Sequence, residues 1–182
     1  MIKPTISVLA ACMLAAACTN GAQGDPLEPT TPGIAIDSPT APEFSGISHW
    51  INSPPLTMAK LRGKVVLVEF WTYDCINCIH VIPHVKQWHE RYKDQGLVVV
   101  GVHTPEYGHE RILGNLEKAV KRFDITYPVA QDNDYETWNA YGNRYWPALY
   151  LIDGNGRIVY RHYGEGGYEA TEARIRHLLT GL

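Results

Sequence analysis

The segment Val65–Cys78 joins an uninterrupted apolar run to two cysteines spaced Cys-x-x-Cys. The run is rich in β-branched residues and has no turn residue, which predicts a strand buried on both faces. From Ile79 to Lys93, apolar residues recur three and four positions apart, which predicts a helix. Cys75 is therefore expected at or just before the helix N-terminus, where free backbone N–H groups and the helix dipole stabilise a thiolate. Cys78 is expected about one turn further along the same side.

This arrangement of thiols is typical of a redox site, in which Cys75 attacks a disulfide and Cys78 resolves the mixed disulfide. A zinc site is disfavoured, because no second cysteine pair of similar spacing is present and a helical His80 would point away from both thiols. A structural disulfide would close too small a loop to add much stability. We therefore expect thiol redox chemistry that needs no metal and no cofactor.

The N-terminal region has the features of an export signal. Lys3 precedes an apolar stretch, Ile6–Ala17, which is too short to cross a membrane and ends in small residues. The following residues, up to Glu43, are rich in proline, glycine, serine and threonine, which predicts a flexible tether. We expect a signal peptide over residues 1–17, a tether over residues 18–43 and one folded domain over residues 44–182.

The Ala-Ala-Cys ending of this signal resembles the lipobox of bacterial lipoproteins. The resemblance implies that Cys18 is lipidated and becomes the mature N-terminus, with Cys12 as the alternative because Leu9 stands three residues before it. It also implies a protein of the cell envelope, outside the cytoplasm and held on a membrane by its lipid. Nothing favours a nucleic-acid partner, because 16 basic and 19 acidic residues give a formal net charge of −3 without a basic cluster.

The rest of the chain alternates between strands and helices. Further strands are predicted at Leu97–Val102, Tyr127–Ala130, Ala148–Ile152 and Arg157–His162. Further helices are predicted at Glu110–Phe123, Asp134–Tyr141 and Tyr168–Leu179, and Ile47–Leu61 is expected to be irregular. The last two strands are joined by a glycine-rich link, which predicts an antiparallel hairpin. This order implies an α/β fold with a central mixed sheet covered by helices on both faces.

Together these features resemble the thioredoxin superfamily over about residues 44–182. The most similar branch contains the extracytoplasmic TlpA- and ResA-like thiol-disulfide oxidoreductases, with an inserted helix–strand element at about Thr104–Val129. The motifs Phe70–Cys78 and Gly101–Glu106 further resemble the carboxy-terminal redox domain of DipZ proteins. The resemblance implies a thioredoxin-like fold and thiol:disulfide exchange.

The resemblance also implies roles for residues around the dithiol. Trp71 falls on an active-site tryptophan and Pro83 on the proline that bends the active-site helix. Pro147, preceded by Trp146, falls on a cis-proline beside the dithiol, which implies that Trp146, Pro147 and Trp71 border a substrate groove. A simple strand-entry proline and a shielding tryptophan are the alternatives for Pro147 and Trp71.

Glu69 falls on the buried acid of the superfamily, six residues before Cys75. Its place in an apolar strand predicts a pKa well above the ordinary value, because burial disfavours the charged form. A carboxyl group beneath Cys78 could exchange a proton with it, which makes Glu69 a candidate catalytic residue. The alternative is a salt-bridged core residue.

Four further residues carry weaker signals. His80 and His84 could chelate a metal from one helix face, but we expect them to be partly exposed helix residues. His103 and Glu106 are expected on a loop at the carboxyl edge of the sheet, where α/β sites gather, although a packing or loop-shaping role fits equally well.

The sequence thus predicts an exported thiol:disulfide oxidoreductase, more specifically a reductase of disulfides in envelope proteins that a membrane donor re-reduces. One alternative is a thiol peroxidase, because Thr72-x-x-Cys75 resembles the peroxiredoxin site, although Val68 stands where that site has a proline. Another is a copper-handling module similar to the Sco proteins, which use a Cys-x-x-x-Cys spacing instead. Ile76-Asn77, in place of the Gly-Pro of thioredoxin, leaves the direction of electron flow open.

Overall fold

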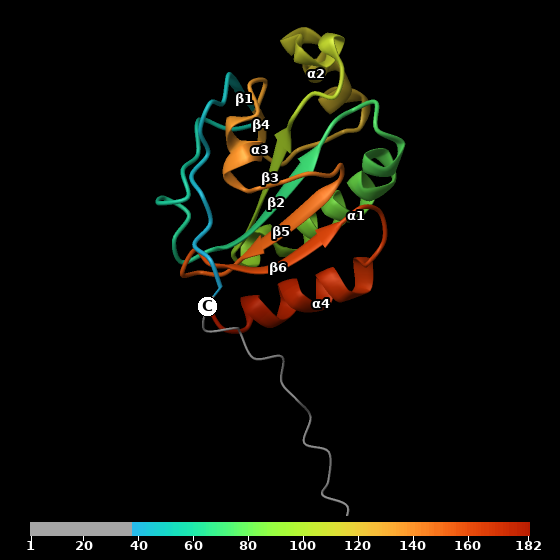
Figure 1. Ribbon diagram of the computed structural model, residues 1–182. Coiled ribbons are helices and arrows are strands. Elements are labelled where there is room, and N and C mark those ends of the chain that lie inside the picture. The colour runs from blue at the N-terminus through green and yellow to red at the C-terminus, as the bar shows by residue number, and fades with distance from the viewer. Residues whose placement is uncertain (1–37) are drawn as a thin grey trace, which may run out of the picture. The chain divides into compact units, whose positions relative to one another are not determined.

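The computed structural model describes residues 38–182, which form a mixed sheet with helices on both faces (Figure 1). The strands are β1 (His49–Ile51), β2 (Val65–Trp71), β3 (Leu97–His103), β4 (Val129–Gln131), β5 (Ala148–Ile152) and β6 (Ile158–Tyr163). The helices are α1 (Ile76–Tyr92), α2 (Leu113–Arg122), α3 (Glu136–Ala140) and α4 (Tyr168–Leu179), with short 3-10 turns η1 (Lys93–Gln95) and η2 (Gly108–Arg111). The expected signal peptide, Cys12 and Cys18 lie outside the described residues, as does most of the expected tether.

β2 lies at the centre of the sheet, whose order is β1-β4-β3-β2-β5-β6. It pairs in parallel with β3, placing Glu69 beside Gly101, and antiparallel with β5, placing Glu69 beside Leu149. β5 and β6 form the antiparallel hairpin that the glycine-rich link predicts. The mixed sheet covered by helices that the sequence predicts is confirmed.

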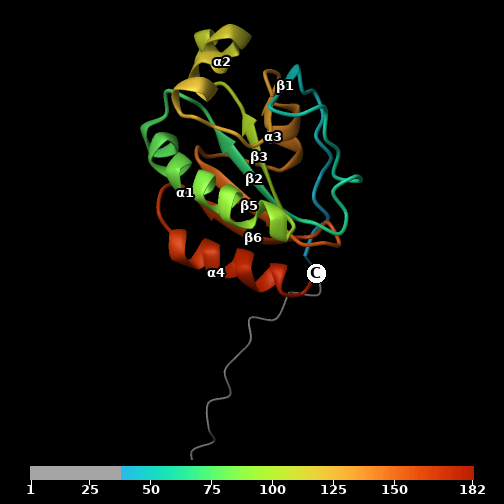
Figure 2. The same cartoon turned by 180° about the vertical axis from the view of Figure 1, so that it is seen from behind.

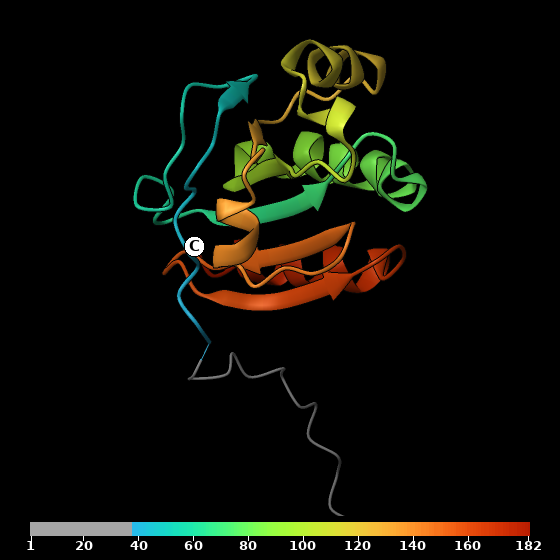
Figure 3. The ribbon, with the colours of Figure 1, turned by 45° about the horizontal axis from the view of Figure 1, so that its top comes forward.

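Successive residues of β2 point to opposite faces of the sheet, and each face has its own hydrophobic cluster. Val65, Leu67 and Trp71 pack with Cys78 of α1 and Ile175 of α4, and both helices cover this face (Figure 2). The opposite cluster contains Val66, Val68 and Phe70, and it is covered by α3 and the segment before β1 (Figure 3). By its position in the strand, Glu69 shares the face of Leu67 and Trp71, beneath α1.

The segment before β2 is more regular than the sequence indicates. β1 lies within the stretch expected to be irregular and pairs antiparallel with β4. A strand of three residues is too short for its sequence pattern to predict this pairing. Packing also begins before Phe44, because Ala41 is buried and its N–H donates to Gly156 O at 2.9 Å. Pro39 O accepts a bond from Ile158 N at 2.9 Å, so residues 39–41 continue onto the hairpin.

The single helix expected over Glu110–Phe123 is wrong, because the chain forms η2 and α2 with Ile112 extended between them (φ −79, ψ 115). The break has a local cause, since the Glu110 carboxylate accepts the backbone N–H groups of Glu106 and Tyr107 and closes a separate turn. α1 begins at Ile76, directly after Cys75 as the sequence predicts, with Pro83 inside it. Within residues 38–182 no helix has the length and apolar character needed to span a membrane.

Candidate redox site

Cys75 is the N-cap of α1, in extended backbone conformation, and its Sγ accepts the N–H of Cys78 at 3.3 Å. This is the helix-terminal position that the sequence predicts. The hydrogen bond from the Cys78 thiol, assisted by the backbone N–H groups of Cys78 and Asn77, lowers the pKa of Cys75 to about 7. Because the side chain is only half-buried, the thiolate can reach a partner.

Cys78 is also a thiol, but it is buried where Cys75 is partly exposed. Both cysteines are free thiols, but Cys78 has no exposed surface. Burial raises its pKa far above the ordinary value, and the hydrogen bond to the Cys75 sulfur adds to this effect. The two thiols are therefore unequal: one is poised as a thiolate near neutral pH, whereas the other needs a base before it can react.

Glu69 is the buried acid of the site, with no exposed surface. Burial raises its pKa to about 8, as expected from its place in an apolar strand. Its Oε2 accepts a hydrogen bond from the Tyr127 hydroxyl at 3.0 Å, and its Oε1 has no hydrogen-bond partner within the described part of the chain. Its charge also disfavours a thiolate at Cys78, which places the two groups within electrostatic reach. Its partner is thus a neutral hydroxyl, not the cation of a core salt bridge.

The Trp146–Pro147 peptide bond is cis, as the resemblance implies. The Trp146 indole N–H donates to Thr104 O at 3.0 Å, and Trp146 and Cys75 both pack, partly buried, against the cluster beneath α1. The Pro147 carbonyl accepts the N–H of Gly164 at 2.8 Å. Trp71 has no exposed surface and Pro147 is also buried, which leaves the partly buried Trp146 as the residue of this set that can face a client.

His103 lies at the end of β3 and is fully buried. Its ring stacks on Tyr73 with centroids 5.4 Å apart, and its Nε2 lies 3.2 Å from Thr72 Oγ1. Burial lowers the pKa of His103 to about 3, so the imidazole stays neutral. These contacts support the packing role. Glu106, in contrast, is exposed, and its charge opposes the Cys75 thiolate.

Glu110 is a residue of the site that the sequence interpretation missed. Its buried carboxylate accepts the N–H of Asp74 at 3.3 Å, as well as those of Glu106 and Tyr107 at 2.6 and 2.8 Å. It therefore fastens the inserted segment to the turn that precedes Cys75. The available signal was a glutamate three residues after Tyr107, which is the spacing of a capping box.

The histidines of α1 are engaged in other contacts. His80 Nδ1 lies 3.0 Å from Glu165 Oε2, and the His84 ring stacks on Tyr168 at 3.5 Å. A separate group of possible ligands, Asp74, His109 and Glu110, has its atoms within 4.8 Å of one another. Because the Glu110 oxygens already accept three backbone N–H groups, this group is explained as a structural contact.

Comparison with known proteins identifies the family. The sequence model of the AhpC/TSA family matches residues 39–161. Protein DipZ of Mycobacterium tuberculosis is 52% identical over 143 residues, which are 77% of this chain but only 21% of DipZ. Thiol-disulfide oxidoreductase YkuV of Bacillus subtilis is 30% identical over 138 residues, 76% of this chain and 93% of that protein.

Solved structures agree with this result. The solution structure of a thioredoxin-like protein in the oxidised form has a TM-score of 0.72 at 30% identity, covering 79% of this chain and 97% of that one. A thiol-disulfide isomerase from Corynebacterium glutamicum has a TM-score of 0.68 at 26% identity, covering 77% and 97%. The chain therefore belongs to the AhpC/TSA family of thioredoxin-like proteins.

Proposed function

We propose that this protein is an exported reductase of disulfides in envelope proteins, with Cys75 as nucleophile and Cys78 as resolving thiol. The observation that carries this proposal is the unequal setting of the two thiols. Cys75 is accessible and has a lowered pKa, whereas Cys78 is buried and has a raised one. Only the first can attack an external disulfide at neutral pH.

In the proposed cycle, the Cys75 thiolate forms a bond to one sulfur of a client disulfide and releases the other as a thiolate. Cys78 then loses its proton to Glu69, attacks Sγ of Cys75 and displaces the client's second sulfur as a thiolate. Both electrons of the dithiol now belong to the client, which takes up protons, and Cys75 and Cys78 are joined by a disulfide. A dithiol protein of the membrane returns the electrons.

The client is proposed to bind across the turn at Trp146 and Pro147. An extended peptide can pair with free backbone groups beside a binding site. The Pro147 carbonyl already accepts a hydrogen bond from Gly164, so in this proposal the client pairs with the backbone N–H and C=O of Trp146. Ile76, next to Cys75 in the chain, and Tyr145, next to Trp146, are exposed by 61% and 56% and offer apolar surface, which fits an unfolded or partly folded polypeptide.

The pKa of Cys75 supports the reducing direction. A strongly oxidising dithiol owes its potential to a highly stabilised thiolate, with a pKa of about 3.5 in DsbA, against about 7 in thioredoxin. Cys75, at about 7, matches the reductant. A reduction potential near −270 mV, measured against a glutathione buffer, is the expected result, and one near −120 mV would make the protein an oxidant.

The location rests on the sequence of residues 1–43. A signal peptide over residues 1–17, a lipid on Cys18 and a flexible tether would hold the domain beside a membrane in the cell envelope. Mass spectrometry of the protein extracted from membranes is expected to find lipidated Cys18 as the first residue. A mature protein that begins at Cys12, or one without lipid, would contradict this assignment.

Three assays on the purified protein separate the candidate activities. We expect reduction of insulin disulfides by the wild-type chain and none by Cys75→Ser. Consumption of hydrogen peroxide would favour the thiol peroxidase, and stoichiometric copper binding would favour the copper-handling module. Neither is expected, because Val68 stands where a peroxidase site has proline and the cysteine spacing is one residue shorter than in copper-handling relatives.

A further inference from the structure

The hydroxyl of Tyr127 reaches the redox site from the inserted segment, just before β4. It donates to Glu69 Oε2 at 3.0 Å, and both side chains have no exposed surface. Tyr127 therefore occupies one oxygen of the buried carboxyl group and leaves Oε1 without a hydrogen bond inside residues 38–182. The charge of Glu69 disfavours ionisation of both Cys78 and Tyr127, and the charge of Cys78 also acts on Tyr127, so the three groups lie within electrostatic reach of one another.

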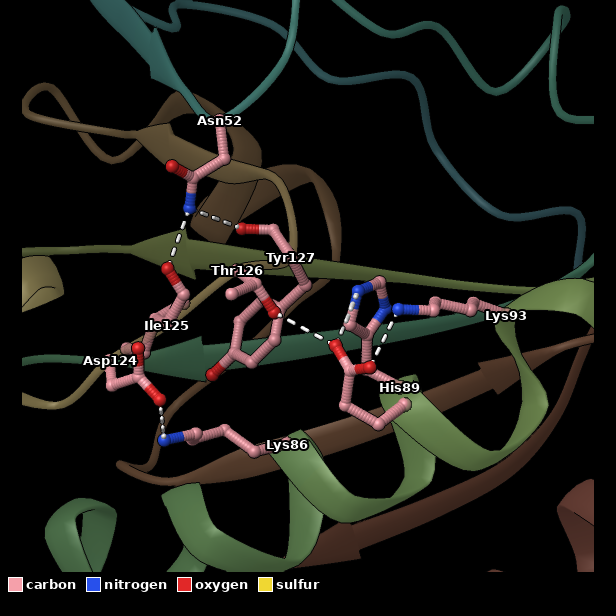
Figure 4. Close-up of polar contacts among 9 residues, drawn as sticks. Asn52, Lys86, His89, Lys93, Asp124, Ile125, Thr126 and Tyr127 are labelled. Atoms are coloured by element: carbon pink, nitrogen blue, oxygen red, sulfur yellow. Dashed lines mark hydrogen bonds and ion pairs between the residues drawn. The ribbon is translucent and has the colours of Figure 1, made fainter.

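Tyr127 is held by contacts on both sides of the segment that delivers it (Figure 4). The side-chain amide of Asn52 donates to Ile125 O at 2.9 Å and to Tyr127 O at 3.0 Å. From α1, Lys86 Nζ donates to Asp124 Oδ2 at 3.1 Å and to Phe123 O at 2.8 Å. Thr126 Oγ1 also donates to Glu90 Oε1 at 3.2 Å.

The ring of Tyr127 is confined as tightly as its backbone. One edge faces Gly101 of β3, where an added Cβ would lie 3.0 Å from Tyr127 Cε2. The ring of His89 from α1 packs against it edge-on, with centroids 5.9 Å apart. The hydroxyl therefore has little freedom to leave Glu69.

From this geometry we propose that Tyr127 is the positioning residue of the Glu69 carboxyl group, and that residues 124–127 act as a strap that keeps its hydroxyl on Oε2. Oε1 is then the oxygen that receives the Cys78 proton during resolution. This inference rests on the proposed roles of Glu69 and Cys78. It gives the inserted segment a part in the chemistry, through a residue that does not itself touch the client.

The hydrogen bond from Tyr127 shifts the pKa of Glu69 in a definite direction. A donor on Oε2 favours the carboxylate, so it lowers the pKa of Glu69 against the larger, opposite effect of burial. The titratable groups that face the Glu69–Tyr127 pair are Cys78 and His89 from α1, and the neighbours of Glu69 in the sheet, Gly101 and Leu149, do not ionise. Loss of the hydroxyl should therefore make the carboxylate rarer at neutral pH.

A stopped-flow experiment can separate attack by Cys75 from resolution by Cys78. The reduced full chain is mixed with an aromatic disulfide that releases a coloured thiolate. Attack by Cys75 releases the first thiolate, and resolution by Cys78 releases the second. In Tyr127→Phe we expect an unchanged first phase. The pH midpoint of the second phase should rise by about one pH unit, which slows resolution roughly tenfold below that midpoint.

Tyr92→Phe is the matched control. Tyr92 is a buried tyrosine in the same hydrophobic core as Tyr127, but its hydroxyl donates to a different carboxylate, that of Glu172, at 2.7 Å. This variant should keep the wild-type midpoint. If Tyr127→Phe does not fold, Asn52→Gly tests the strap instead, since glycine accepts the positive φ of 66° at this position and removes both bonds to the segment. A smaller shift in the same direction is expected.

An unshifted midpoint in a folded Tyr127→Phe protein overturns the inference, as does an equal shift in Tyr92→Phe. Infrared titration of the Glu69 carboxyl, identified by its loss in Glu69→Gln, gives a readout independent of activity and should move in parallel. If the second phase keeps its wild-type pH profile in Glu69→Gln, the proposed role of Glu69 itself fails, and the two failures are thereby distinguished.

Discussion

The buried carboxylate of Glu110 accepts the backbone N–H of Asp74 at 3.3 Å, which ties the inserted segment to the residue directly before Cys75. The same carboxylate closes the turn at Glu106 and Tyr107. One side chain thus fixes both the loop that carries Glu106, whose charge acts on Cys75, and the turn from which α1 begins. The insertion is built into the redox site at two points, here and at Tyr127.

Glu110→Ala is expected to lower the free energy of unfolding by about 2–3 kcal/mol, because it leaves partly buried N–H groups without an acceptor. Glu117→Ala is the control, since Glu117 is exposed on α2 and should change stability by less than about 0.5 kcal/mol. Urea unfolding measures both. Equal effects in the two variants would show that the Glu110 contacts contribute nothing specific.

Alkylation of Cys75 requires its thiolate, so the alkylation rate is expected to rise with pH through a midpoint near pH 7. In Cys78→Ala that midpoint should move upward, since the hydrogen bond from the Cys78 thiol is the main cause of the lowered pKa. Cys78→Ser, which keeps a donor, should shift it less. Iodoacetamide labelling followed by mass spectrometry across pH gives the three midpoints, and identical values would rule out this source of activation.

The resolving role proposed for Cys78 predicts which variant should accumulate mixed disulfides with clients. Cys78→Ser should accumulate mixed disulfides through Cys75, whereas Cys75→Ser should form none, because the buried Cys78 cannot reach an external disulfide. Non-reducing electrophoresis of membrane extracts, followed by peptide mapping, identifies the bonded cysteine. Trapping through Cys78 would reverse the two roles.

The sequence predicts the parts of this molecule that depend on local patterns. The strand–dithiol–helix unit, the hairpin and α4 follow from apolar periodicity and turn residues, and the raised pKa of Glu69 follows from its apolar strand. β1 was missed because a three-residue edge strand is defined by its partner β4 rather than by its own residues. Glu110 and Tyr127 were missed because their contacts join residues 36 and 58 positions apart, and no local pattern encodes such distances.

The last prediction concerns stability and pH, and it follows from the buried carboxyl of Glu69. Its pKa is raised from 4.5 to about 8 in the folded protein, so the folded state binds its proton more tightly than the unfolded state does. The stability that this proton contributes is fully present below pH 4.5 and is lost as pH rises towards 8. The slope is roughly 1.4 kcal/mol per pH unit at most.

Glu69→Gln removes this proton linkage while keeping the size of the side chain and an acceptor for Tyr127. The difference in unfolding free energy between the variant and the wild type should therefore shift in favour of the variant as pH rises between 4.5 and 8. Glu106→Gln, an exchange at an exposed carboxylate, should show no comparable trend. Urea unfolding at several pH values measures the difference. A constant difference across this range would mean that Glu69 titrates in the folded protein as it does in the unfolded chain, and it could then not act as a base poised near neutral pH.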